Sequence, residues 1–551
     1  MNKFYGSLLL VALLSAGYIN CQKAMAQAAK PTDNGVPAKN KIGSFISVKP
    51  TGQTETAVIP FETHSFQLLA KSGQTTYSDG SVMPIGNDFT AFISKNGSSK
   101  EGYLSINHEN TPGGVSLLDI HLDEASNTWK VDKIRKVDFS PLVQTTRNCS
   151  GGITPWGTVI TSEETTNKAD LNKDGYEDVG WQVEIDPVSG KIRDYDGDGK
   201  PDKLWALGRM SHENIAIGAD RKTVYQAEDG GSNGVYKFVA DVPGNLSQGK
   251  LYVLKRDSET ATTGTWVLVP NTTQADRNNT YVLGKSLGTN WRNPEDIEFG
   301  PDGKMYFTTK GSGDIWRFKD NGTTVSGIEA WVTRQEYEIK YNGGTQKEDW
   351  NTGIDNLTFD GEGNLWALQD GGRDNVWVIR PDHTPAKPNV ELFMTTPAGS
   401  EPTGLTFSPD FKYGFISLQN ASGANATVTK DAAGKDVVFN TATTIVFARN
   451  QFLGKNGQGN NKEQTSQLQA YPNPFQSSSQ VKVNLPKTAN VTLEVYDMQG
   501  VKLETLAKGT LNKGEHVFEY KPSASSTEAL YLVRLLVDGQ ETSTRIVRGD
   551  K

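Results

Sequence analysis

Cysteine is almost absent from this sequence, which carries only Cys21 and Cys149 in 551 residues. So little cysteine excludes a scaffold stapled by disulfides. Long apolar runs are also missing after Ala26, so no later segment is expected to span a membrane. No block of basic residues exists and the net charge is -8, which argues against nucleic acid as a partner.

The segment 1–26 is typical of a secretory signal. Lys3 supplies the positive start, Leu8 to Ala16 form an apolar core too short to cross a bilayer, and Ala26 ends a small-x-small cleavage site. The alternative is a lipoprotein attached through Cys21, although Asn20 precedes it where a small residue is usual. Cleavage after Ala26 would leave Cys149 as the only thiol, at risk of oxidation unless it is buried or ligated.

Long amphipathic helical patterns are few, whereas glycine is abundant, with 56 residues. One signal recurs between residues 41 and 452: an acidic residue, an apolar-x-apolar triplet, a tight turn and an aromatic-rich strand. Its copies begin at Glu213, Glu295 and Asp355, with a looser one at Glu401. Repeated strand-turn-strand units predict an all-β fold, a β-propeller.

In a propeller the starts of the innermost strands converge on the central axis, so the repeat gathers several carboxylates in one place. Such crowding is costly unless cations neutralise it. Taken singly, each acid is equally well explained as a turn or strand cap; in register, they favour a metal site.

The composition changes after residue 452. We expect a signal peptide at 1–26, a disordered segment at 27–40, the propeller at 41–452, a linker at 453–469 and a small β-sandwich at 470–551, with strands at Val481 to Leu485, Val491 to Tyr496 and Leu530 to Val537.

Two loops place oxygen donors at alternate positions before a glycine, like the first half of a calcium-binding loop. Neither is followed by a clear helix with Glu at the twelfth position, so a solvated acidic turn remains the alternative to structural calcium. The candidate ligands are Asp170, Asn172, Asp174 and Asp178 in the first loop, and Asp194, Asp196, Asp198 and Asp202 in the second.

The stretch from Arg147 to Thr158 contains Cys149 beside a glycine pair and is followed by Glu163 and Glu164. A thiolate with carboxylates and no His-rich motif argues against a zinc-protease site and suits iron beside calcium. Cys149 as a small buried hydrophobe is the alternative. His108 and His212, which each precede a Glu, could be ligands, orienting residues or core histidines.

A series of motifs between positions 80 and 420 resembles the PhoX-type alkaline phosphatases. The motifs are Asn107-His108-Glu109, the stretch Asn148 to Thr158 with Glu163-Glu164, Gly208-Arg209 with His212-Glu213, Pro294-Glu295, and Glu401 with Thr403-Gly404. The resemblance implies a six-bladed propeller whose iron and calcium cluster hydrolyses phosphate monoesters. Fe³⁺ and Ca²⁺ are therefore the expected cofactors, and a phosphate ester the expected substrate.

Carried over to this sequence, the resemblance makes Cys149 the iron-binding thiolate and assigns carboxylate ligands to Glu109, Glu164, Glu213, Glu228, Glu295 and Glu401. Asp355 is added to the expected ligands because of its position in the repeat, and no family motif includes it. Arg209 would lie near the phosphate. The family often has Arg immediately before Pro-Glu, but this chain has Asn293, so Arg292 or Lys310 is the candidate replacement.

The segment 470–551 resembles the C-terminal sorting domain of the Bacteroidetes type IX secretion system. The likeness rests on Tyr471 to Phe475, Val495 to Gly500 and Arg545-Ile546-Val547. It implies export by that machinery and a secreted or cell-surface location. A carbohydrate-binding or adhesive sandwich is the alternative for this segment.

The sequence therefore predicts a secreted, monomeric, metal-dependent phosphatase. Two alternatives stay open: a phosphodiesterase, lactonase or other hydrolase on the same scaffold, and a surface protein that binds calcium without catalysis.

Overall fold

The computed structural model describes residues 41–371, 373–454, 467–473, 475–485, 487–497, 501–523, 530–537 and 540–548. The chain divides into two compact units, Met1–Lys455 and Asn456–Lys551. The expected signal peptide, the segment 27–40 and most of the expected linker lie outside the described residues, so those domain assignments stay predictions. None of the described helices combines the length and the apolar character that a membrane crossing requires.

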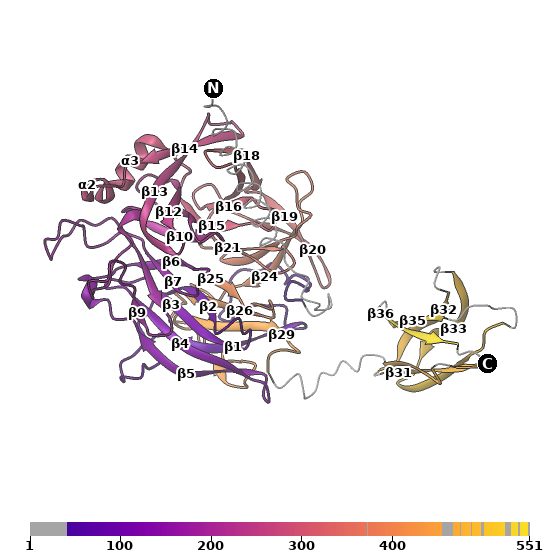
Figure 1. Ribbon diagram of the computed structural model, residues 1–551. Helices are drawn as coiled ribbons and strands as arrows, with labels where there is room; N and C mark the ends of the chain where they lie inside the picture. Colours follow the sequence, from indigo (N-terminus) through magenta and orange to yellow (C-terminus); the bar gives the residue numbers. More distant parts are fainter. Residues whose placement is uncertain are drawn as a thin grey trace, which may run out of the picture. The chain divides into compact units, whose positions relative to one another are not determined.

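The first unit consists almost entirely of antiparallel strands that follow one another as meanders (Figure 1). One four-stranded sheet contains β2 (Asn87–Ser94), β3 (Glu101–His108), β4 (Gly114–Asp123) and β5 (Thr128–Lys136). Another contains β6 (Asn148–Ile153), β7 (Val159–Glu163), β8 (Gln182–Asp186) and β9 (Lys191–Ile192). A third contains β21 (Ile354–Phe359), β22 (Leu365–Gln369), β23 (Asn375–Ile379) and β24 (Val390–Thr395).

A nine-stranded sheet lies between β9 and β21 in sequence. Its order is β10 (His212–Ile217), β11 (Thr223–Glu228), β12 (Val235–Val242), β13 (Asn245–Arg256), β14 (Thr263–Val269), β18 (Thr324–Val332), β17 (Asp314–Asp320), β16 (Met305–Thr309) and β15 (Pro294–Phe299). The pairing of β14 with β18 covers only three residue pairs, so two meanders meet there edge to edge.

The chain closes on itself through a sheet that combines both ends of the unit. Its order is β1 (His64–Lys71), β29 (Thr443–Arg449), β26 (Tyr413–Gln419) and β25 (Glu401–Phe407). The smaller elements are η2 (Ser140–Leu142), η3 (Trp205–Leu207), α2 (Gln274–Asn278), α3 (Thr280–Leu287), β19 (Glu336–Tyr341), β20 (Gly344–Asp349), β27 (Thr429–Lys430) and β28 (Asp436–Val437). The pairing of β1 with β29 covers what would otherwise be an open sheet edge.

The first strand of each meander contacts the first strand of the next. The contacts run from β2 to β6, β10, β15, β21, β25 and back to β2. These inner strands therefore form a closed ring, and the predicted β-propeller is confirmed. The count of six blades stays a prediction.

Each inner strand has a β-bulge at the same place, near its start. The register shifts lie between Asn87 and Thr90, Asn148 and Gly151, His212 and Ile215, Pro294 and Ile297, Ile354 and Leu357, and Thr403 and Thr406. A bulge sets two residues opposite one and re-aims their side chains. The repeated bulge lets consecutive residues, such as Glu295 and Asp296, both turn away from the hydrophobic layers between the sheets.

Side chains from the bulges tie neighbouring inner strands together. Asp296 accepts a hydrogen bond from the Leu357 backbone at 2.9 Å, and Asn356 accepts one from the Gly404 backbone at 2.9 Å. Asn107 donates to the carbonyl oxygens of Cys149 and Ser150 at 2.9 and 2.8 Å. These bonds satisfy backbone groups that the bulges remove from the ladders.

The second unit packs two antiparallel sheets around one apolar core. The three-stranded sheet contains β30 (Gln467–Tyr471), β31 (Ser479–Leu485) and β34 (Gly514–Tyr520); the four-stranded sheet contains β33 (Lys502–Leu511), β32 (Ala489–Tyr496), β35 (Leu530–Val537) and β36 (Gln540–Val547). Alternate residues of β31 and β32, including Val481, Val483 and Leu493, are buried. The predicted sandwich is confirmed, but its sorting role is untested, and Pro474 and Met498 to Gly500 lie outside the described residues.

The glycine pair of the Cys149 stretch lets β6 approach its neighbours closely. A Cβ on Gly152 would lie 2.1 Å from the Ile215 carbonyl oxygen of β10, and one on Gly151 would lie 2.1 Å from the Ile160 carbonyl oxygen of β7. Both contacts are with backbone atoms, which cannot swing aside.

We predict that Gly152→Ala lowers the free energy of unfolding by about 1–3 kcal/mol, because the added methyl forces two inner strands apart. Urea unfolding of the purified chain measures it. Gly52→Ala is the matched control, because a Cβ there meets no atom within 4 Å, and it should stay within about 0.5 kcal/mol of the wild type. Equal stabilities for the two variants would contradict this account of the pair.

Candidate metal centre

In the hairpins β2–β3, β6–β7, β10–β11, β15–β16 and β21–β22, two positions supply the side chains that gather at the ring. The first residue of the inner strand pairs with the last residue of the second strand, as His212 does with Glu228 and Asn87 with His108. Where the register shifts, the residues that follow these pairs come close together, as Asp88 does to Glu109 and Cys149 to Glu164. On the inner strands they are Asp88, Cys149, Glu213, Glu295 and Asp355; after the second strands they are Glu109, Glu164, Asp229, Lys310, Asp370 and Asn420.

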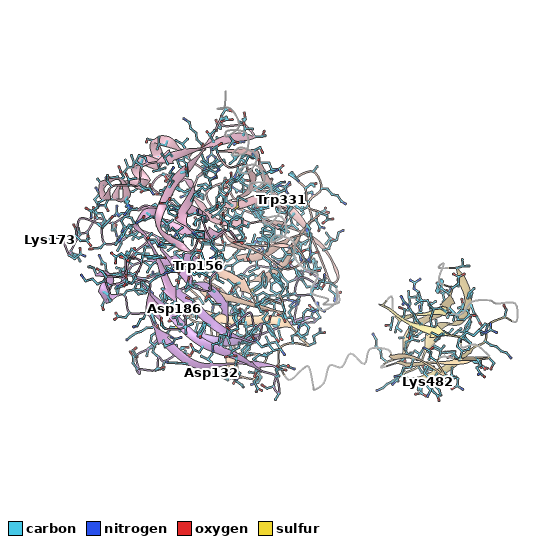
Figure 2. All side chains as sticks on the ribbon, viewed as in Figure 1. Asp132, Trp156, Lys173, Asp186, Trp331 and Lys482 are labelled. Atoms are coloured by element: carbon cyan, nitrogen blue, oxygen red, sulfur yellow. The ribbon has the colours of Figure 1, made fainter. Side chains whose placement is uncertain are left out.

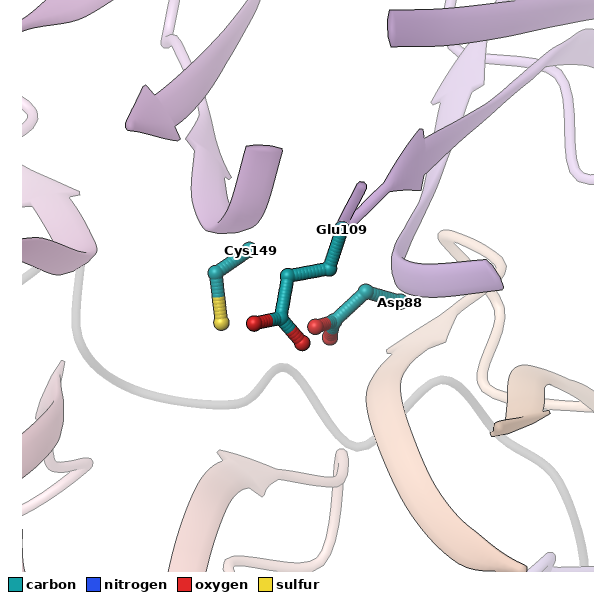
Figure 3. A group of neighbouring side chains, drawn as sticks. All are labelled: Asp88, Glu109 and Cys149. Carbon is teal, nitrogen blue, oxygen red and sulfur yellow. The ribbon is translucent and has the colours of Figure 1, made fainter. Parts of the chain in front are cut away.

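Cys149 lies among carboxylates that belong to different sheets (Figure 3). Its sulfur forms one group with Asp88 and Glu109 and a second with Glu164 and Glu213, the donor atoms of each group lying within 4.8 Å of one another. Sγ lies 3.5 Å from Glu213 Oε2. A third such group joins Glu213 to Asp229 and Glu295.

Arg147 stands beside the Cys149 groups. Its Nη2 donates to Glu109 Oε1 at 2.7 Å and also to Glu164 Oε2. The side chain is 46% exposed, and among the described residues its Nε and Nη1 make no hydrogen bond. Arg147 thus bridges two carboxylates and keeps donors free for a solute.

Lys310 lies among the remaining carboxylates. Its Nζ is 2.6 Å from Asp370, 3.0 Å from Asp355 and 3.9 Å from Glu295. Glu401, the first residue of β25, forms a hydrogen bond with Asp370 and accepts one from Asn420 Nδ2 at 2.8 Å.

Burial and crowding of like charges raise the pKa of most acids in the ring. Burial, with Asp88 and Glu213 next to it, holds the pKa of the Cys149 thiol well above its ordinary range. Burial and neighbouring carboxylates do the same for the pKa of Asp88, Glu213 and Glu295. Burial and the bond to Asp370 raise the pKa of Glu401 to about 10. These groups would therefore hold protons near neutral pH unless cations replace the protons.

Lys310 shows the opposite balance. Burial alone would lower the pKa of its ammonium group, but the carboxylates of Asp355, Glu295 and Asp370 raise it above its ordinary value. The ammonium group therefore stays charged.

The donor set fits metal ions. Carboxylate oxygens suit hard cations such as calcium, and one thiolate adds a soft ligand that suits iron. Among the described residues, none forms a hydrogen bond with the buried Glu295 Oε1, and Lys310 Nζ lies 3.9 Å from it, so this oxygen keeps its lone pairs for a metal ion.

We call three or more Cys, Asp, Glu or His side chains with donor atoms within 4.8 Å of one another a metal-type group. Glu228, an expected ligand, is in none of these groups among the described residues. Its carboxylate accepts hydrogen bonds from the Ser232 backbone and hydroxyl and from the Tyr236 hydroxyl. The next residue, Asp229, takes the place in the ring, and Asn293 Nδ2 donates to it. Asn293, at the departure from the family pattern, thus supports a carboxylate.

Two of the three expected phosphate-binding cations do not lie at this centre. Arg209 is buried, and its guanidinium donates to the carbonyl oxygens of Val179 and Asn167, which tie loops together. Arg292 is exposed and lies near Asp314. Among the described residues neither forms an ion pair with a carboxylate of the ring.

The two histidines are core residues rather than ligands in this arrangement. His108 Nε2 lies 2.6 Å from Ser116 Oγ, and His212 Nε2 lies 2.9 Å from the Gly208 carbonyl oxygen. Burial lowers the pKa of His108 to about 4 and that of His212 to about 3, so both rings are neutral near pH 7.

Lys173, in the first aspartate loop, lies at the outer edge of the first unit (Figure 2). The second loop follows β9, the last strand of its sheet. Asp170 accepts hydrogen bonds from the backbones of Asp174 and Gly175, and Asp194 from those of Gly197 and Gly199. Only the second loop brings three carboxylates together, those of Asp194, Asp196 and Asp202. Structural calcium in these loops stays a prediction.

The sequence interpretation gave no ligand or binding role to Asp88, Arg147, Asp229 and Asp370, although the segment Glu228 to Gly230 was part of the candidate active site. Arg147 was inside the motif, and Asp88 begins a copy of the repeat whose triplet is less apolar. Asp229 and Asp370 share one signal, since each directly follows the aromatic-rich strand of a recognised copy.

Comparison with known proteins identifies the family of the chain and structures of similar fold. The family model for alkaline phosphatase PhoX matches residues 124–422. The structure of Pseudomonas fluorescens PhoX in complex with vanadate, a transition state analogue, is similar at 19% identity and a TM-score of 0.57, covering 75% of this chain and 100% of that one.

Other structures are more distant. A streptogramin B lyase has 11% identity and a TM-score of 0.37, covering 70% of this chain and 98% of that one. A catalytically inactive virginiamycin B lyase from Staphylococcus aureus with quinupristin has 12% identity and a TM-score of 0.36, covering 70% and 99%. No curated protein matches the chain.

We predict that Asp229→Asn removes bound metal and that Glu228→Gln does not. Of these two adjacent carboxylates, Asp229 faces the ring, whereas Glu228 is bonded to Ser232 and Tyr236. The measurement is elemental analysis of the two purified variants after dialysis, with the wild type as reference. Loss of metal from Glu228→Gln alone would show that the ligand is the residue expected from the sequence.

Proposed function

The chain belongs to the alkaline phosphatase PhoX family, a metal-dependent phosphatase family, and from this premise we propose that it hydrolyses phosphate monoesters at an iron and calcium cluster in the centre of the ring. The observation that carries the proposal is the position of Cys149. The only thiol among the described residues lies within reach of carboxylates from several sheets.

In this proposal Cys149 binds iron as a thiolate, with Asp88, Glu109, Glu164 and Glu213 around it. Asp229 and Glu295, which form a group with Glu213, would add oxygen ligands for calcium. The bound cations would supply positive charge that attracts and polarises the phosphate group of the ester.

Arg147 is the residue we propose to bind the phosphate. Its planar guanidinium is held by Glu109 and Glu164 through one nitrogen, which leaves the other donors for two phosphate oxygens. Arg147 would then take over the role for which Arg292 and Lys310 were the candidates. Because Glu109 and Glu164 also belong to the Cys149 groups, the same contacts would orient the phosphate towards the cluster.

The proposal includes export. The signal-like stretch 1–26 and the sandwich unit with its sorting-type motifs support secretion by the type IX machinery to the cell surface or medium. A monomeric state also stays a prediction.

We predict that the purified chain, loaded with iron and calcium, releases the chromophore from a chromogenic phosphate monoester, and that Cys149→Ser lowers this rate more than about 100-fold through loss of the iron ligand. Lys304→Gln, in the β15–β16 turn, is the control and should keep the full rate.

The outcomes separate the alternatives. Unchanged hydrolysis in Cys149→Ser would remove the thiolate from the mechanism. Cleavage of a phosphodiester or lactone panel without monoester cleavage would indicate another hydrolase, and calcium content without iron or hydrolysis would indicate a binding protein.

Arg147→Ala should lower kcat/KM for the monoester by about 10²–10³, because a charge-assisted contact to the transition state is lost. Inhibition by inorganic phosphate should weaken in parallel. Arg292→Ala is the comparison and should stay within about twofold of wild type, since Arg292 lies near Asp314. The reverse ranking would return the phosphate-binding role to Arg292.

A further inference from the structure

We propose that the Lys310 ammonium group is a built-in cation of the centre, occupying the place between Asp355, Asp370 and Glu295 where a metal ion would otherwise bind. The inference rests on the proposed metal cluster and concerns its composition. It means that this chain binds one metal ion fewer than a ring with an acidic residue at position 310 would bind.

The distances support a cation site filled by a side chain. Nζ is 2.6 Å from Asp370 and 3.0 Å from Asp355, both hydrogen-bond lengths, and 3.9 Å from Glu295. An ammonium group has three donors in a compact arrangement, and three carboxylates face it here. Glu295 Oε1 is the most distant, and it forms no hydrogen bond within the part of the chain that the structure describes.

The backbone holds Lys310 in this position. Its N–H donates to the Asn293 carbonyl oxygen at 2.8 Å, and its own carbonyl accepts from the Gly353 N–H at 3.0 Å. Asn293 precedes β15 and Gly353 precedes β21, so the residue is fastened between two neighbouring sheets. These bonds fix the point from which the side chain starts, and the contacts of Nζ with Asp370 and Asp355 hold its end.

The position of Lys310 in the repeat gives a second argument. It is the residue after the second strand of its hairpin, where Glu109, Glu164, Asp229 and Asp370 stand in other hairpins. A lysine at one of these places changes a metal ligand into a competitor of the metal. Either a metal ion or a lysine ammonium group can balance the negative charge of a crowded ring of carboxylates.

The metal-type groups are distributed as this inference requires. Among the described residues, the groups in the ring contain Asp88, Glu109, Cys149, Glu164, Glu213, Asp229 and Glu295, and none contains Asp355 or Asp370. Donor atoms suited to metal thus gather on the Cys149 side, whereas Asp355 and Asp370 are partners of Lys310. Glu295 lies between the two.

The test is the metal content of Lys310→Gln. Without the ammonium group, Asp355, Asp370 and Glu295 should bind a divalent cation, so the calcium-loaded variant should contain one more ion per chain than wild type. Lys304→Gln is the matched control and should match the wild type, because Lys304 pairs with Asp302 in the β15–β16 turn. An unchanged or lower ion count in Lys310→Gln would overturn the inference.

A measurement on the wild type decides the matter if Lys310→Gln does not fold. Reductive methylation read by peptide mass spectrometry should leave Lys310 unmodified in both metal-stripped and metal-loaded protein, while exposed lysines such as Lys347 react. If loading with calcium and iron makes Lys310 reactive, a metal has displaced the ammonium group, and the inference is wrong.

These readouts are separate from ester hydrolysis. An extra ion in Lys310→Gln, together with no phosphatase activity in the wild type, would uphold the built-in cation and contradict the proposed function. Hydrolysis of phosphate monoesters by the wild type, together with an unchanged ion count in Lys310→Gln, would support the proposed function and contradict the built-in cation.

Discussion

Crowding of like charges at the centre of a closed ring is the constraint on which this structure depends. The inner strands β2, β6, β10, β15, β21 and β25 contact one another in a circle, and each has a bulge near its start that turns side chains to the middle. Asp88, Glu213 and Glu295 are buried there. Buried carboxylates of one sign are stable only with protons, cationic side chains or metal ions.

Different side chains stabilise the carboxylates in different parts of the ring. Arg147 joins Glu109 to Glu164, Asn293 donates to Asp229, and Lys310 faces Asp355 and Asp370. Near Cys149, Glu109 and Glu164 have Arg147 as their cationic partner and Gln419 donates to Glu109, whereas the carboxylates of Asp88 and Glu213 lie in groups with the Cys149 sulfur. This unequal distribution is why metal is proposed for the Cys149 side, and it is consistent with membership of a metal-dependent phosphatase family.

Much of the fold could be predicted because strand pairs repeat. The copies at Glu213, Glu295, Asp355 and Glu401 became β10–β11, β15–β16, β21–β22 and β25–β26. Glu228 and Asp229 show the limit, because both are acidic and adjacent, and only the end of β11 decides which one faces the ring. Arg209 shows another limit. Its motif suggested a phosphate contact, but buried carbonyl oxygens of distant loops take its donors.

The sequence by itself determined the all-β class, the repeat, the isolated thiol and the abundance of acids, because these depend on local pattern and composition. Only the tertiary structure decided which acids share a space and which cation each one meets. Lys310 and Asp370 are 60 positions apart, and Arg147 and Glu109 are 38 apart. Their contacts exist because ring closure through β1 and β29 brings every hairpin end to one centre, and no local pattern encodes that distance.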